Sequence, residues 1–190
     1  MSDNWNQRQK AWELLSQHVK SERLIKHCLA VEAGMLTYAR IYGEDQDRWA
    51  AIGLLHDVDY EEFPDTHPLA SVKILSDNGY DQVFIDSIQS HATEAERSTR
   101  EAKVLYAADE MCGFMVACAL VRSPKGFEDM QVKSVMKKFK DKAFARAINR
   151  ENAGIAAMDL GITLEEHIDN LIVGMRVREA ELNSLNQSLL

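Results

Sequence analysis

The chain has 190 residues, of which 46% are hydrophobic and 27% are charged, a composition typical of a globular protein. Its net charge of −8 at pH 7 argues against a general nucleic-acid binder, which normally presents a basic surface. No apolar run approaches the ~18 residues that span a bilayer, and the polar first residues lack a signal-peptide pattern. We therefore expect one soluble domain over residues 1–190, with neither a membrane nor a nucleic-acid duplex as partner.

Helical periodicity runs along nearly the whole chain, and strand-like alternation is almost absent. The pattern predicts helices over residues 8–19, 21–42, 45–56, 68–79, 81–90 and 99–122, followed by two or three more. The last of these begins at Thr163, where Glu166 three residues later completes a capping-box pattern. No repeat or linker divides the chain, so the predicted fold class is all-α, a single-domain helical bundle.

Three cysteines indicate the compartment. Cys28, Cys112 and Cys118 form no CxxC pair and lie within apolar helical patterns. An odd, unclustered set of cysteines is typical of reduced thiols rather than of a disulfide framework. We therefore expect a cytoplasmic protein.

Basic residues gather between residues 133 and 146. This segment contains five lysines and one arginine but a single acid, Asp141. Apolar residues at helical spacing in the same segment, among them Val135 and Phe139, favour an amphipathic helix with the lysines on its solvated side. The alternative is a surface that attracts a small anion.

A histidine–aspartate pair, His56-Asp57, follows an apolar run from Trp49 to Leu55. Neutral imidazoles and carboxylates are usual ligands of divalent transition metals. On a regular helix the two side chains would point about 100° apart. They can therefore share one ion only where the helix ends, or one of them can bridge to a second ion. The alternative is a histidine favoured by the helix dipole, followed by a loop aspartate.

Four further residues are candidate ligands. His27 lies on the inward face of its predicted helix, where a lone histidine is more often a packed core residue. His67 precedes a proline and His91 ends an apolar helix, and alone neither is specific. Asp109 is a stronger indication of a ligand because it lies in an apolar run. An unpaired carboxylate there would destabilise the fold by roughly several kcal/mol. Its partner is either a metal ion or a salt bridge to Lys103 or an arginine.

Taken in order, these residues resemble the HD superfamily of metal-dependent phosphohydrolases, in its HDIG-like bacterial branch. The resemblance rests on Leu54-Leu55-His56-Asp57, on His27 after Leu24-Ile25-Lys26, and on Ala108-Asp109. The motif-bearing core covers about residues 20–125, and the helices of about 126–190 look specific to a subfamily.

The resemblance implies a ligand set and a cofactor. It implies that His27, His56, Asp57 and Asp109 hold a first metal ion. His67 and His91 match the extra ligands of members that hold two metals, with Asp57 as the bridge. The cofactor is then one or two divalent ions: Fe, Mn, Zn, Co or Ni, with Mg as a further candidate.

The sequence departs from the family pattern after the doublet, where Val58-Asp59-Tyr60 replaces Ile-Gly and no lysine precedes Lys73. A lysine-assisted mechanism is therefore not expected. Nearby acids are the alternative for positioning ligands or donating a proton. The candidate catalytic residues are Asp57, Asp59 and Glu62, with Glu61 as a further acid, and the candidate phosphate-binding residues are Lys103, Arg122 and Lys125.

The predicted function is hydrolysis of a phosphate ester or anhydride, in a nucleotide or related small anionic molecule, by a metal-activated water. Two alternatives stay open: a di-iron oxygenase on the same fold, which cleaves a C–H or C–P bond, and a non-catalytic module that binds metal or nucleotide. His18 and His167 lie outside the motif order, and we predict surface or packing roles for them.

Overall fold

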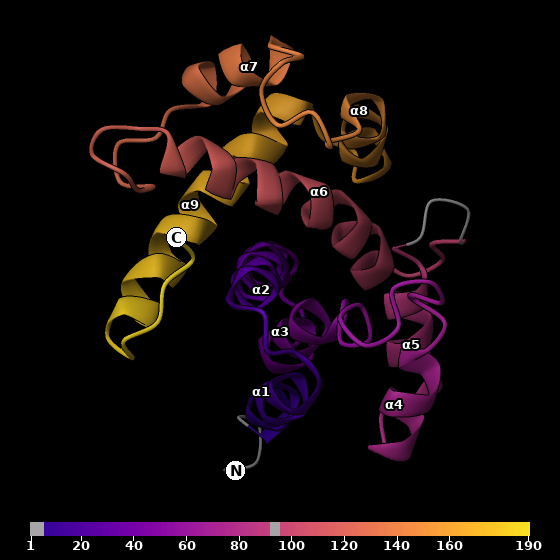
Figure 1. The fold of residues 1–190 in the computed structure, drawn as a ribbon. Helices are drawn as coiled ribbons and strands as arrows, with labels where there is room; N and C mark the ends of the chain where they lie inside the picture. The colour runs from indigo at the N-terminus through magenta and orange to yellow at the C-terminus, as the bar shows by residue number, and fades with distance from the viewer. Residues whose placement is uncertain (1–5, 92–95) are drawn as a thin grey trace.

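The computed structural model describes residues 6–91 and 96–190, and these residues form nine α-helices and no β-strand (Figure 1). The helices are α1 (Asn6–His18), α2 (Glu22–Tyr42), α3 (Gln46–Leu55), α4 (Ser71–Asp77), α5 (Gln82–Gln89), α6 (Arg100–Leu120), α7 (Val132–Lys140), α8 (Arg150–Asp159) and α9 (Leu164–Asn183). The predicted all-α class is confirmed. None of the helices in this described part is long and apolar enough to cross a membrane. The first residues, where no signal peptide is expected, fall largely outside the described ranges.

Most helix ends agree with the cap residues read from the sequence. The hydroxyl of Thr163 accepts from the Glu166 amide, and the Glu166 carboxylate accepts from the Thr163 amide, so the predicted capping box is present. Asp45 caps α3, and Gly43 ends α2 with a φ of 70°, a left-handed conformation that glycine adopts without a Cβ clash.

One predicted boundary is wrong, because α4 begins at Ser71 rather than at Pro68. Residues 66–71 form tight turns instead, in which the Leu69 amide donates to the Thr66 carbonyl (2.7 Å) and the Ser71 amide to the Pro68 carbonyl (3.2 Å). The Ser71 amide also donates to Oδ2 of Asp59 (2.9 Å). A side chain from the preceding loop therefore caps the helix, which the local pattern around the proline does not show.

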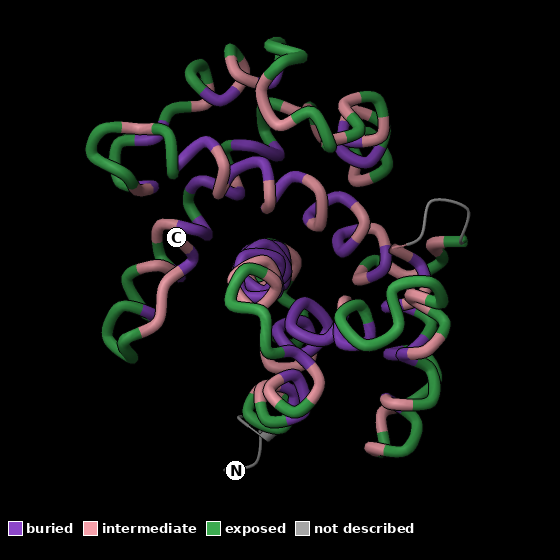
Figure 2. Tube along the Cα trace, viewed as in Figure 1, coloured by how far each residue is buried: buried purple, intermediate pink, exposed green. Residues whose placement is uncertain are grey.

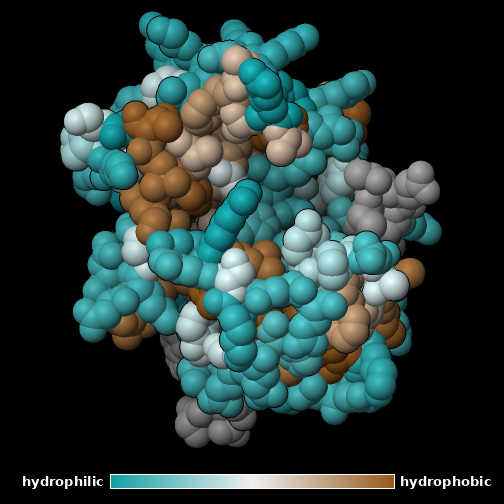
Figure 3. Space-filling view, in the orientation of Figure 1, coloured by the Kyte–Doolittle hydropathy of each residue, from teal (hydrophilic) through white to brown (hydrophobic). Residues whose placement is uncertain are grey.

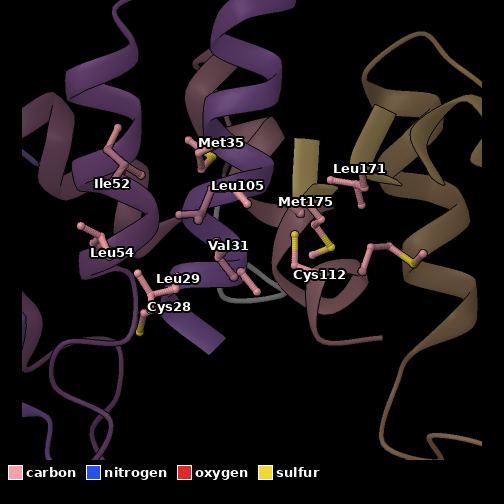
Figure 4. Packing of buried hydrophobic residues seen from close by; sticks show 14 of the residues in the cluster. Cys28, Leu29, Val31, Met35, Ile52, Leu54, Leu105, Cys112, Leu171 and Met175 are labelled. Carbon is pink, nitrogen blue, oxygen red and sulfur yellow. The ribbon is translucent and has the colours of Figure 1, made fainter. Parts of the chain in front are cut away.

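The second helix, α2, lies in the middle of the molecule and packs against α3, α6 and α9 (Figures 1 and 2). Most of its residues from Cys28 to Ala39 are buried. Figure 4 shows the core on either side of this helix, with Ile52 and Leu54 of α3 on one side and Cys112 and Met175 of α6 and α9 on the other. This packing brings His27 of α2 close to His56 at the end of α3.

Two glycines allow these helices to approach closely. A Cβ added to Gly53 of α3 would lie 2.7 Å from the Cα of Glu32 in α2, so this contact is made between backbones. A Cβ on Gly34 of α2 would lie 2.8 Å from Sγ of Cys112 and 3.0 Å from Cβ of Ala108, both in α6. The spacing of α2 from both neighbours therefore depends on missing side chains.

A buried ion cluster ties α2 to both ends of the chain. The fully buried carboxylate of Glu32 accepts from Arg178 of α9 at 2.9 Å and from Arg8 of α1. Removing one partner of such a cluster leaves an uncompensated buried charge. The cluster therefore specifies the register of α1 and α9 on α2.

The basic segment and the cysteines agree with the sequence. Val135 and Phe139 of α7 are buried, while Lys133, Lys137 and Lys140 are exposed, which confirms a solvated basic face. All three cysteines are buried and free of disulfides. Burial raises the pKa of the Cys28 thiol to about 12, so this thiol stays protonated at neutral pH.

We expect Gly53→Ala to lower the free energy of unfolding by about 1–3 kcal/mol, because its methyl group would press on the backbone of α2. Urea unfolding followed by circular dichroism measures the change. Gly154→Ala is the matched control, since a Cβ there meets open space within α8. That substitution should stabilise the protein by about 0.5–1 kcal/mol. Equal effects at the two positions would contradict the close approach of α3 to α2.

Candidate metal centre

The end of α3 brings His56 and Asp57 to the same site. The helix ends at Leu55, His56 is its C-cap, and residues 56–62 continue in turns. The apolar residues before His56 are buried. The chain leaves the axis of α3 at the doublet, where the turns begin. Both side chains can therefore point toward the same site. From the sequence, this arrangement is expected only where the helix ends.

A first group of donor atoms comes from α2, α6 and the end of α3. Its members are Nε2 of His27, Nε2 of His56, Oδ2 of Asp57 and Oδ1 of Asp109. The five separations recorded among them range from 3.0 to 3.6 Å. A tetrahedral ion with bonds of 2.0–2.1 Å would separate its ligands by about 3.3 Å. The group therefore has the dimensions of a metal site.

A second group lies on the other oxygen of the same aspartate. Oδ1 of Asp57 is 3.3 Å from Nε2 of His67 and 3.8 Å from Nε2 of His91, and the two nitrogens are 2.9 Å apart. Asp57 with His27 and His56, and Asp57 with His67 and His91, are each groups that could hold a metal ion. Asp57 thus faces one group with each carboxylate oxygen, which is the arrangement of a bridging ligand.

Hydrogen bonds at Nδ1 orient three of the four imidazoles. The acceptors are the Gly53 carbonyl for His56 (2.9 Å), the Ile88 carbonyl for His91 (2.5 Å) and Oδ1 of Asp59 for His67 (2.7 Å). Because carbonyl and carboxylate oxygens only accept, each Nδ1 donates its proton. In the neutral ring Nε2 then carries a lone pair, as a metal ligand must.

The donor set therefore fits a cation. In their neutral forms His67 and His91 would point two lone pairs at each other across 2.9 Å, with no proton between them. A shared positive charge relieves this repulsion. Imidazole and carboxylate together suit first-row divalent ions, whereas Mg²⁺ prefers oxygen ligands alone.

Residues 24–112 match the HD domain family. Over these residues the chain is similar to that family. Comparison with curated proteins and with solved structures gave no match. The matched segment contains all six candidate ligands, the whole of α3 to α5, most of α2 and the first part of α6. The HDIG-like branch stays a prediction.

The charges of the HD domain centre favour a bound cation. Burial lowers the pKa of His56, but the carboxylates of Asp57 and Asp109 outweigh burial and hold this pKa well above its ordinary value. Burial raises the pKa of Asp57, yet His56 outweighs it, and this pKa is lowered to about 2. Burial and then the charge of His56 lower the pKa of His91. Burial also raises the pKa of Asp109, but His27 and His56 outweigh it and hold this pKa well below its ordinary value, so both carboxylates are ionised at neutral pH.

Asp109 has histidines as its partners. Its Oδ1 lies 3.0 Å from Nε2 of His27 and 3.5 Å from Nε2 of His56, and no salt bridge to Lys103 or an arginine occurs among the described residues. The side chain is 24% exposed rather than fully buried, and His27 is 26% exposed. His56 is fully buried and His91 nearly so. The centre is therefore most open on the side of His27 and Asp109.

The acids after the doublet take different positions. Asp59 is fully buried and accepts from both His67 and the Ser71 amide, so it positions His67. Glu61 accepts from the amides of Lys20 and Ser21 between α1 and α2. Glu62 lies 3.3 Å from His18 and has no recorded contact with the six candidate ligands. A catalytic role for Glu62 stays a prediction.

A cavity of about 1130 Å³ adjoins the open side of the centre and is lined in part by His27. Its positively charged lining residues are Arg23 and Lys26, which the sequence reading missed. The sequence feature that could have identified them is their position on the same helix, within four residues of His27. The predicted phosphate ligands Lys103, Arg122 and Lys125 do not line this cavity, and their role stays a prediction.

The two remaining histidines lie away from the centre. His167 is buried, and its Nε2 donates to the Ala107 carbonyl (3.0 Å) while its Nδ1 accepts from the Tyr38 hydroxyl (2.6 Å). This is the packing role expected of it. His18 is partly exposed beside Glu62.

We expect Asp57→Ala to lose bound metal while the helical fold survives, because this carboxylate faces both donor groups. The loss of affinity should exceed the roughly 10–100-fold typical of residues that only orient ligands. Elemental analysis of protein purified without chelator measures the metal, and circular dichroism measures the helices. Asp86→Ala, on the exposed face of α5, is the matched control. A variant at Asp57 with full metal content would contradict the bridging assignment.

Stability should depend on pH through His167. Burial lowers the pKa of His167 to about 4, below its value of about 6.5 in an unfolded chain. Between these values the unfolded state binds a proton that the native state does not, so the free energy of unfolding rises with pH. His167 should therefore contribute about 3 kcal/mol above pH 6.5, and lose it as the pH falls toward 4.

Urea unfolding at a series of pH values tests this dependence. His167→Gln should show a shallower fall in stability between pH 6.5 and 4 than the wild-type protein. His18→Gln, at a partly exposed histidine, should keep the wild-type slope. The same slope in His167→Gln as in the wild-type protein would show that His167 does not stay neutral in the fold.

Proposed function

We propose that this HD domain is a metal-dependent phosphohydrolase whose ligands are His27, His56, Asp57, Asp109, His67 and His91. The observation that carries the proposal is the division of the Asp57 carboxylate between two groups of imidazole nitrogens. Such a site holds two ions close together, the arrangement used to displace a leaving group from phosphorus. The match to the HD domain family supports the same reading.

When bound, divalent ions at this site lower the pKa of water, so that hydroxide is present at neutral pH, and neutralise charge on phosphate oxygens. The residues of the chain prepare the place for this chemistry. Asp59 orients His67, and backbone carbonyls orient His56 and His91. Because these acceptors are buried or belong to the backbone, the imidazoles lose little freedom when a ligand arrives.

The substrate reaches the centre from the side of His27 and Asp109, the most exposed of the six candidate ligands. On that side Arg23 and Lys26 line the cavity. Their positive charges suit a small phosphate-bearing molecule. Lys26 is paired with Glu22 at 2.7 Å, whereas Arg23 is exposed and has no recorded ion pair among the described residues. Arg23 is therefore the better candidate for holding phosphate oxygens.

Oxygen chemistry on the same ligands remains the second candidate, because four imidazoles and two carboxylates also suit a di-iron site. Hydrolysis consumes water alone, whereas an oxygenase consumes dioxygen. The two functions therefore separate cleanly in an anaerobic assay.

We expect metal-free protein to be inactive and to gain phosphatase activity when reconstituted with Mn²⁺, Fe²⁺ or Co²⁺. The assay uses p-nitrophenyl phosphate and a panel of nucleotides, with and without oxygen. Activity should persist without oxygen, and Asp59→Asn should lower it about 10–100-fold by loosening His67. Asp65→Asn, an exposed acid of the same loop, is the control. Turnover that stops without oxygen would favour the oxygenase, and full metal loading without turnover would favour a binding module.

A further inference from the structure

The cavity beside His27 continues away from the metal centre along α6 to the last described residues. Its lining includes His27 and Gly113 and also Leu189 and Leu190. A Cβ added to Gly113 would lie 3.7 Å from Nδ1 of His27, an ordinary contact distance, so this part of the cavity borders the histidine directly. A molecule held at the centre by its phosphate can therefore extend into the cavity.

One wall of this cavity is apolar. Its apolar side chains come from α2, from the C-terminal half of α6 and from the end of the chain: Leu24, Val116, Ala117, Leu120, Leu189 and Leu190. Figure 3 shows a hydrophobic patch on the viewed face, in the region where α6 ends and the last residues return beside it. Exposed apolar surface that continues into a cavity is a usual feature of ligand sites.

The end of the chain is held in place as part of this wall. The Ser188 hydroxyl donates to Oε1 of Glu179 (2.6 Å), and the Leu189 amide donates to Oε2 of the same carboxylate (2.7 Å). Leu189 is fully buried as a result. The wall is therefore formed before a ligand arrives, which lowers the entropy cost of binding.

The polar groups among the lining residues are mostly engaged within the protein. Glu22 is paired with Lys26, and Glu61 accepts from the amides of Lys20 and Ser21. A sugar or a nucleobase in the cavity would need hydrogen-bond partners, and each group left without one costs free energy. An apolar group needs none.

We propose that the substrate is a phosphate ester whose organic part is an apolar chain, which lies in this cavity against α6 and residues 189–190. The anionic head reaches the metal centre past His27, and Arg23 at the same end offers it a positive charge. The inference rests on the proposed function and names its substrate class. It excludes nucleotides as the preferred substrates.

Binding of alkylphosphonates to the Mn²⁺-loaded protein tests the substrate class by isothermal titration calorimetry. The series methyl-, butyl- and octylphosphonate keeps the head constant and lengthens the chain, and adenosine monophosphate is the polar comparison. The dissociation constant should fall about fourfold for each added methylene that is buried. Adenosine monophosphate should bind more weakly than octylphosphonate.

A variant that fills the cavity tests whether the alkyl chain of the ligand lies against this wall. Ala117→Trp should reduce the ratio of octylphosphonate to methylphosphonate affinity by at least tenfold. Ala180→Trp is the matched control, because Ala180 is exposed on α9 and does not line the cavity. It should keep the wild-type ratio. Metal content and circular dichroism show that each variant is folded and loaded.

The outcomes separate the two proposals. Affinities that do not change with chain length, or tighter binding of adenosine monophosphate, overturn the apolar substrate class if p-nitrophenyl phosphate is still hydrolysed. An unchanged ratio in Ala117→Trp also overturns it. Failure to hydrolyse any phosphoester, together with failure to bind methylphosphonate, overturns the proposed function and the inference with it.

Discussion

The close packing of α2 against α3 and α6 determines the geometry of the site. At Gly53 the backbone of α3 touches that of α2, and at Gly34 α2 approaches the side chains of α6. These two contacts determine how far His56 and Asp109 lie from His27, which α2 carries. Side chains in a close-packed interior cannot absorb a change in helix spacing without strain. The donor separations near 3.3 Å are thus a consequence of helix packing.

Within this frame the centre is organised by electrostatics. Two ionised carboxylates are surrounded by four imidazoles, and Asp57 serves both halves of the arrangement. Where helices and turns end, backbone carbonyls accept from the histidines and leave their Nε2 atoms facing inward. Helix ends have unpaired carbonyl groups, so they suit this purpose better than helix interiors. The candidate ligands His56 and His91 lie in such places, whereas His67 lies in a turn and is held by the Asp59 carboxylate.

The cavity and the centre share His27, and this connection links the chemistry to a choice of substrate. The same helix, α6, places Asp109 at the centre and, two and three turns later, apolar side chains that line the cavity. A single long helix would thus place the reacting end and the apolar end of the proposed substrate in fixed register. Residues 188–190, held by Glu179, complete the wall from a part of the chain outside the matched HD domain segment.

The sequence by itself determined the all-α class, most helix ends and the types and order of the six candidate ligands, because periodicity and caps depend on residues within a few positions of one another. It also placed the lysines of α7 in solvent. Only the tertiary structure decided that Asp109 pairs with histidines rather than Lys103, that Asp59 positions His67 and caps α4, and that Arg23 lines the cavity. Those relations depend on how closely and at what angle separate helices pack, and helix packing is set by side chains distant in the chain.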